Sequence, residues 1–69
     1  MPLSFADMEQ ENVISRIGGN DSTKKFLESL GFVPGESVKI INKLGGNVIV
    51  EIKNSRVAVS EEMARRIMV

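Results

Sequence analysis

The sequence predicts a small, mainly β domain with short helices, in which a strongly bent sheet closes into a partly open barrel. Short segments rich in β-branched residues recur between glycine-containing breaks, as strands joined by turns do. Helix signals are confined to two short segments. The chain has 69 residues, so we expect residues 1–69 to form a single domain whose few strands must curl to enclose a core.

A polar lead-in and a first strand open the chain. Residues 1–12 are mainly polar, and Leu3, Phe5 and Met8 are their candidate anchors in the core. The segment Val13–Ile17 is rich in β-branched residues and is the expected first strand. The glycines that follow it end this strand.

One helix is expected next, over Ser22–Leu30. Asp21 and Ser22 offer side-chain oxygens to the free amides of its first turn. Gly31 is expected to end it, because glycine adopts the left-handed conformation of a helix end at little cost. The apolar face of this helix is expected to contain Phe26, Leu27 and Leu30.

An apolar pair follows the helix, in a connection where polar residues are typical. Pro34-Gly35 predicts a turn into the next strand. A hydrophobic residue directly after a terminal glycine often packs on the last helical turn, and we expect Phe32 to do so. Val33 has no such constraint and is a candidate contact for a partner.

Further strands are expected to form an antiparallel meander, over Ser37–Lys43, Val48–Lys53 and Arg56–Val59. A slip of one residue would turn every side chain to the other face, so the apolar faces predict the register. The expected pairs are Val38 with Ile52, Ile40 with Val50, Lys39 with Glu51, Ile41 with Ile49, Lys43 with Asn47, and Val57 with Ile52. The turns would then be Leu44-Gly45-Gly46 and Asn54-Ser55.

A second helix, of about two turns, is expected at the end of the chain. Ser60 is its expected cap, and Glu61 and Glu62 lie where the helix dipole favours acidic residues. Met63 and Ile67 share a face that we expect to close the sheet.

Enzymatic chemistry is not expected. The chain has no histidine and no cysteine, so it lacks the usual proton shuttle and the thiol nucleophile. Its glycine pairs lack the spacing and the lysine of a phosphate-binding loop. The 9 basic and 9 acidic residues cancel, and tyrosine and tryptophan are absent, which disfavours nucleic-acid binding. No cofactor is expected.

No metal site is predicted either. Asp7, Glu9 and Glu11 could attract a hard cation weakly, but a solvated acidic edge is the favoured interpretation. The four methionine thioethers suit soft metals, although Met63 and Met68 are expected to fill gaps in the core. The chain shows neither a signal peptide nor an apolar run of bilayer length, so we expect a cytoplasmic protein.

A binding module remains, with apolar residues at unusual places. Ile41 and Ile49 lie on the expected outer face of the sheet, and Leu44 lies at a hairpin tip. Exposed apolar patches often mark interfaces. The candidate partner-contact residues are Phe32, Val33, Pro34, Ile41, Leu44 and Ile49. The pair Ile41 and Ile49 is also a candidate seam between copies of the chain.

The order of these residues resembles the FeoA family of small cytoplasmic accessory proteins in bacterial ferrous iron uptake. The resemblance covers nearly the whole chain, and its sharpest motif is LGFVPG, Leu30 to Gly35, ahead of an alternating strand. It implies an SH3-like barrel with a helix inserted after the first strand. It also implies a partner, the FeoB-type ferrous iron transporter, bound through its cytoplasmic GTP-binding part or through its membrane part. Such proteins assist or regulate the transporter without carrying iron themselves.

The chain departs from the family pattern at two loops. Leu44-Gly45-Gly46-Asn47 stands where Leu-Gly-Asp-Pro is common, and residues 8–11 replace a usual Pro-Gly. Partner recognition could therefore differ. Two alternatives stay open: a metal-responsive regulatory domain like the C-terminal domain of iron-dependent repressors, and a small RNA-binding barrel.

Overall fold

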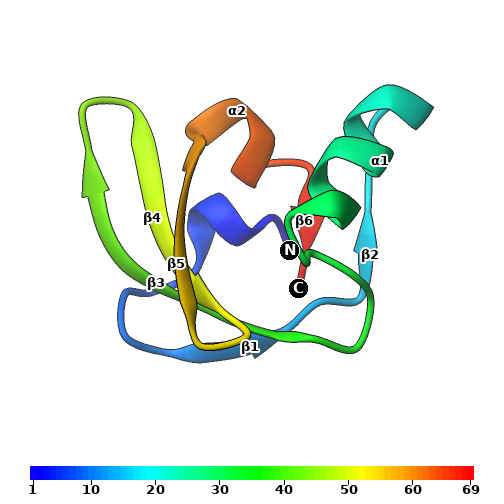
Figure 1. Cartoon of the computed structure of the whole chain (residues 1–69). Coiled ribbons are helices and arrows are strands. Elements are labelled where there is room, and N and C mark those ends of the chain that lie inside the picture. Colours follow the sequence, from blue (N-terminus) through cyan, green and yellow to red (C-terminus); the bar gives the residue numbers. More distant parts are fainter.

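Two antiparallel sheets enclose the core of the protein (Figure 1). The computed structural model describes residues 1–69. The larger sheet has the strand order β1-β3-β4-β5, and the smaller one pairs β2 with β6. The elements are the 3-10 turn η1 (Leu3–Phe5), β1 (Glu11–Val13), β2 (Arg16–Ile17), α1 (Asp21–Ser29), β3 (Ser37–Leu44), β4 (Asn47–Ile52), β5 (Ser55–Ser60), α2 (Glu61–Ala64) and β6 (Ile67–Met68). The result is the expected mainly β fold, a small and partly open barrel.

The meander of β3, β4 and β5 is present, and the first part of its register is confirmed. Val38 pairs with Ile52, and Ile40 pairs with Val50. Period-2 alternation turns these four side chains to the same face, where all of them are buried. Lys39 faces Glu51 on the other side of the sheet, also as predicted.

Beyond Ile40 the predicted register is wrong, because β3 carries an extra residue. Ile41 has no partner on β4, and Asn42 takes its place opposite Ile49. The expected pairs of Ile41 with Ile49 and of Lys43 with Asn47 therefore do not form. The loop shrinks to Gly45-Gly46, with φ values of 57° and 82°, because a tight turn with two positive φ angles matches the twist of a hairpin.

The second hairpin also differs from the prediction. Val57 pairs with Val50 rather than Ile52, and Lys53-Asn54 forms the turn in place of Asn54-Ser55. Both turn residues have positive φ angles, 51° and 62°. The change of register is an even number of residues, so Val57 and Val59 keep the inward orientation that the sequence predicted.

The expected strand Val13–Ile17 is instead divided between the two sheets. β1 pairs with β3, whereas β2 pairs with β6. The chain turns the corner at Ile14, whose amide donates to the Glu36 carbonyl (2.9 Å) and whose carbonyl accepts from the Gly35 amide (2.8 Å). A strand that changes sheets at such a bend is how a small barrel turns its corners.

Helix α1 is present, with a different cap and a narrower apolar face than predicted. Asn20 Oδ1 accepts from the Thr23 amide at 2.8 Å, so Asn20 caps the helix rather than Asp21 or Ser22. Leu27 is fully buried, but Phe26 is 49% exposed. One residue turns a helix by about 100°, which takes Phe26 away from the core.

The end of the chain forms one helical turn and a strand in place of a longer helix. Ser60 Oγ accepts from the Met63 amide at 3.2 Å, so the predicted cap of α2 is confirmed. α2 nevertheless ends at Ala64, and Ile67 is buried in β6 by its pairing with Ile17. The two ends of the chain lie side by side (Figure 1), joined by a 2.8 Å bond from the Met1 amino group to the Val69 carbonyl. Neither helix has the length and apolar character that crossing a bilayer requires.

Candidate partner-binding surface

The outer face of the β3–β4 hairpin is divided into a charged half and an apolar half. Lys39 and Glu51 lie on this face nearest the start of β3, and Ile41 and Ile49 follow toward the hairpin tip. All four are partly exposed, whereas the alternating residues between them are buried. One face of this pair of strands therefore builds the core, and the other is free to bind.

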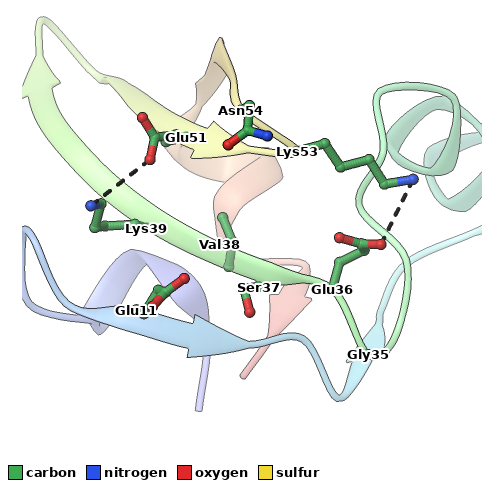
Figure 2. Close-up of a pocket in the computed structure, with 9 residues that line it drawn as sticks. All are labelled: Glu11, Gly35, Glu36, Ser37, Val38, Lys39, Glu51, Lys53 and Asn54. Carbon is green, nitrogen blue, oxygen red and sulfur yellow. Dashed lines mark ion pairs between the residues drawn. The ribbon is translucent and has the colours of Figure 1, made fainter.

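The charged half forms a shallow groove of about 290 Å³ (Figure 2). Lys39 Nζ lies 3.8 Å from Glu51 Oε1, and Lys53 Nζ lies 3.8 Å from Glu36 Oε1. These side chains are between 31% and 55% exposed, so each ion pair contributes at most about 1 kcal/mol. The groove is lined by Glu11, Gly35, Glu36, Ser37, Val38, Lys39, Glu51, Lys53 and Asn54. The sequence alone does not reveal this groove, because its residues come from β1, β3, β4, the connection before β3 and the turn after β4.

The apolar half lies around the extra residue of β3. A bulge bends its strand and leaves the extra residue without a partner, which is the position of Ile41. Leu44, at the tip, is 64% exposed. Leu44 and Asn47 are paired on the same face as Asn42 and Ile49, since each pair is separated from the next by two residues. We call Ile41, Leu44 and Ile49 the hairpin patch.

Phe5 and Met8 lie on a segment at the edge of β3, whereas the sequence predicted them as core anchors. The Glu9 amide donates to the Ile40 carbonyl (2.8 Å), and Lys43 Nζ donates to the Ser4 carbonyl (3.0 Å). The segment between Ser4 and Glu9 therefore runs beside the second half of β3. Its Phe5 and Met8 are 72% and 53% exposed, so this anchor prediction is wrong for both, although Leu3 is fully buried. Both side chains therefore face solvent on the segment that runs beside β3.

The connection after α1 supplies the other predicted contacts, with one correction. Phe32 is fully buried, so it cannot touch a partner while the protein is folded. Its predicted packing at the end of α1 is confirmed: the Phe32 amide donates to the Leu27 carbonyl and the Gly31 amide to the Glu28 carbonyl, both at 3.0 Å. Val33 is half-buried and Pro34 is exposed.

The structure does not bring all the predicted contact residues together. Val33 and Pro34 precede β3, whereas Leu44 ends it, so they lie at opposite ends of this strand (Figure 1). The length of β3, from Ser37 to Leu44, is about 23 Å along the strand. The candidate contacts therefore form two separate surfaces, the hairpin patch and the Val33-Pro34 connection.

No group of three or more histidine, cysteine, aspartate or glutamate side chains is arranged to hold a metal ion. The ladder of Asp7, Glu9 and Glu11, considered from the sequence, does not form such a group. All three residues are exposed to solvent.

The curved meander, the corner at Ile14 and the small second sheet define an SH3-like domain. A family model, described as the FeoA domain, matches residues 1–69. The chain therefore belongs to the FeoA domain family, which confirms the resemblance seen in the sequence.

Individual relatives agree with this assignment. A protein of Methanocaldococcus jannaschii named "Putative Fe(2+) transport protein A" is 32% identical over 68 residues, which are 99% of this chain and 83% of that protein. The zinc complex of FeoA from Stenotrophomonas maltophilia is 29% identical, with a TM-score of 0.87, and covers 100% of this chain and 88% of its own. That FeoA is described as an SH3 domain protein and is suggested to be an activating factor of bacterial ferrous iron transport.

The fold also occurs as part of a longer chain. The structure of IdeR from T. acidophilum is 26% identical, with a TM-score of 0.86. The match covers 100% of this chain but only 32% of the IdeR chain. The same module therefore occurs alone and as one part of a larger protein.

Proposed function

We propose that the protein is a non-enzymatic accessory protein of ferrous iron uptake, and that it acts in the cytoplasm by binding a FeoB-type iron transporter. Membership of the FeoA family supports the pathway. The observation that carries the binding role is the partly exposed hairpin patch, in which Leu44 is 64% exposed, because soluble monomers rarely gather apolar side chains on one surface without a partner.

The GTP-binding domain of the transporter is the proposed partner. The hairpin patch would supply the desolvated centre of the contact, and the charged groove beside it would supply the polar rim. Iron is the cargo of the transporter in this proposal and is not bound by the accessory protein. The Val33-Pro34 connection is the second candidate contact.

An NMR titration of the labelled protein with this domain, with and without nucleotide, tests the proposal. Amide shifts should cluster at Ile41, Leu44 and Ile49. Leu44→Asp should weaken binding by about tenfold or more, because it places a charge in the centre of the contact. Val13→Asp is the matched control, since Val13 is 59% exposed and lies on β1, away from the tip. Equal weakening by both variants, or no binding at all, would refute the proposed contact.

Val33→Asp separates the two surfaces. If Val33→Asp weakens binding and Leu44→Asp does not, the partner binds the connection and the assignment to the hairpin patch is wrong. Thermal unfolding of each variant must match the parent protein, so that a loss of binding is not a loss of fold.

A metal-responsive regulatory domain is the second candidate function. The observation that favours it is the shared fold with IdeR at 26% identity. Anaerobic calorimetry with Fe(II) and with Mn(II) distinguishes the two functions. Tight stoichiometric binding of either metal would favour the regulatory domain. A short RNA serves as a further control, and its binding would support the RNA-binding alternative.

A further inference from the structure

Strand β5 is an open edge of the larger sheet. It pairs with β4 alone, and the strand order ends with it. In Figure 1 no strand lies beside β5 on the side that faces away from β4. An open edge carries backbone amides and carbonyls that can pair with another strand.

The hairpin turn determines which groups of β5 face outward. A two-residue turn makes its flanking residues, Ile52 and Ser55, a hydrogen-bonded pair, and such pairs then alternate along the ladder. The backbone groups of Val57 and Val59 therefore face β4, and those of Arg56 and Ala58 face away. The amide of Glu61, the next residue in the inward series, indeed donates to the Gly46 carbonyl at 2.9 Å.

Apart from the Ser60 carbonyl, which lies at the N-cap of α2, the outward backbone groups of β5 have no partner within the chain. None of the turn, loop or cap hydrogen bonds involves the backbone of Arg56, Ala58 or Ser60, and all three residues are exposed. The strand contains no proline, no lysine and no bulge, which are the usual means of protecting an edge. Arg56 carries its only charge.

We propose that β5 pairs with β5 of a second copy of this chain, antiparallel, about a twofold axis at Ala58. This register places Ala58 opposite itself, Val57 opposite Val59 and Arg56 opposite Ser60. Two hydrogen bonds form at the axis between the Ala58 groups. At each end one more bond forms, from the Ser60 amide of one copy to the Arg56 carbonyl of the other. The reverse bond does not form, because the Ser60 carbonyl is the N-cap carbonyl of α2 and accepts within that helix.

Charge complementarity selects a second copy rather than an unrelated strand. In this register Arg56 of each copy lies beside the start of α2 in the other, where Glu61 and Glu62 are exposed. The twofold axis repeats this attractive contact, and no like charges face each other across it. The inward Val57 and Val59 are partly or fully buried already, so pairing needs no rearrangement of the core.

The first test measures association and amide exchange together. Sedimentation of the full chain should show a reversible monomer–dimer equilibrium. Hydrogen exchange at the Ala58 and Ser60 amides should slow as the protein concentration rises, while the Arg56 amide, which has no bond in this register, should not change. Ala58→Pro removes the central donor without touching the bonds to β4, and it should raise the dimer dissociation constant by about tenfold or more. Ala58→Ser is the matched control and should dimerise normally.

The second test exchanges the charges. Arg56→Glu alone and the double variant Glu61→Lys, Glu62→Lys alone should each dimerise more weakly, because each places like charges across the axis. Mixed together they should form a heterodimer in which both contacts are again attractive. Circular dichroism and thermal unfolding check that each variant is folded.

Three outcomes would overturn the proposal. The first is a wild-type protein that sediments as one monomeric species, with amide exchange independent of concentration up to about 1 mM, a range that includes weak dimers. A dimer that persists unchanged in Ala58→Pro would use another face, such as the hairpin patch with Ile41 and Ile49. Protection of the Ala58 amide only on addition of the transporter domain would show that the edge takes a foreign strand.

Discussion

The Phe32 amide donates to the Leu27 carbonyl at 3.0 Å, and this bond joins the end of α1 to the connection that leads into β3. Both side chains are fully buried. The bond exists because Gly31, between them, has a φ of 104°, a left-handed conformation that turns the chain back on the helix. The buried position of Phe32 therefore explains why an apolar residue stands in this connection.

Phe32→Ala should destabilise the protein by about 3–5 kcal/mol, because it removes a large buried side chain and leaves a cavity. Urea unfolding measures the loss. Such a loss could unfold a domain of this size, so Phe32→Leu provides a second measurement, with an expected cost of about 1.5 kcal/mol. Val33→Ala is the control, since Val33 is only half-buried. A smaller loss for Phe32→Ala than for Val33→Ala would contradict the packing described here.

Gly31→Ala should cost about 1–2 kcal/mol through backbone strain. A Cβ atom at this position would meet only the Lys53 side chain at 3.6 Å, an ordinary contact, so the φ angle is the cause. Gly18→Ala is the matched control, because Gly18 has no positive φ and its Cβ would lie 3.5 Å from the Arg66 carbonyl oxygen. Thermal unfolding that ranks the two variants equally would show that conformation is not the reason for glycine at position 31.

Asn20→Ala should destabilise α1 by about 1 kcal/mol, since Asn20 Oδ1 accepts from the Thr23 amide. Ser22→Ala should change little, because Ser22 lies inside the helix and is exposed. Chemical denaturation of both variants makes the comparison. A larger loss of stability for Ser22→Ala than for Asn20→Ala would indicate that Ser22 caps the helix, as the sequence predicted.

Lys39 and Glu51 should couple by less than about 1 kcal/mol, because the ion pair is long, at 3.8 Å, and its side chains are partly exposed. A double-mutant cycle with Lys39→Ala and Glu51→Ala measures this coupling. It should fall further in 1 M salt, where charges are screened over about 3 Å. A large, salt-independent coupling would mean that the groove in Figure 2 is a rigid structural feature rather than an adaptable surface.

The predicted binding residues are the part of the site that the sequence located least well. Ile41, Ile49 and Leu44 were found because apolar residues at alternating outward positions or at a hairpin tip need an explanation. Phe32 was included because a connection is usually exposed, whereas here it is buried. Phe5 and Met8 were missed as surface residues. Their apolar character is the same in the core and at an edge, and only the bonds from Glu9 and Lys43 place their segment beside β3.

Local chemistry in the sequence determined the helix α1, its glycine end, the cap of α2 and the inward face of β4, of β5 and of the first half of β3. The pairs Val38–Ile52 and Ile40–Val50 followed, because alternation leaves no other match between apolar faces. Alternation cannot detect a shift of two residues, which keeps every side chain on its face, and so the β4–β5 register was wrong. It cannot locate a bulge either. The pairing of Arg16 with Met68 joins opposite ends of the chain, and no local pattern in the sequence indicates it. Only the tertiary structure therefore decided that the first strand is divided, that β6 forms and that β5 is an open edge.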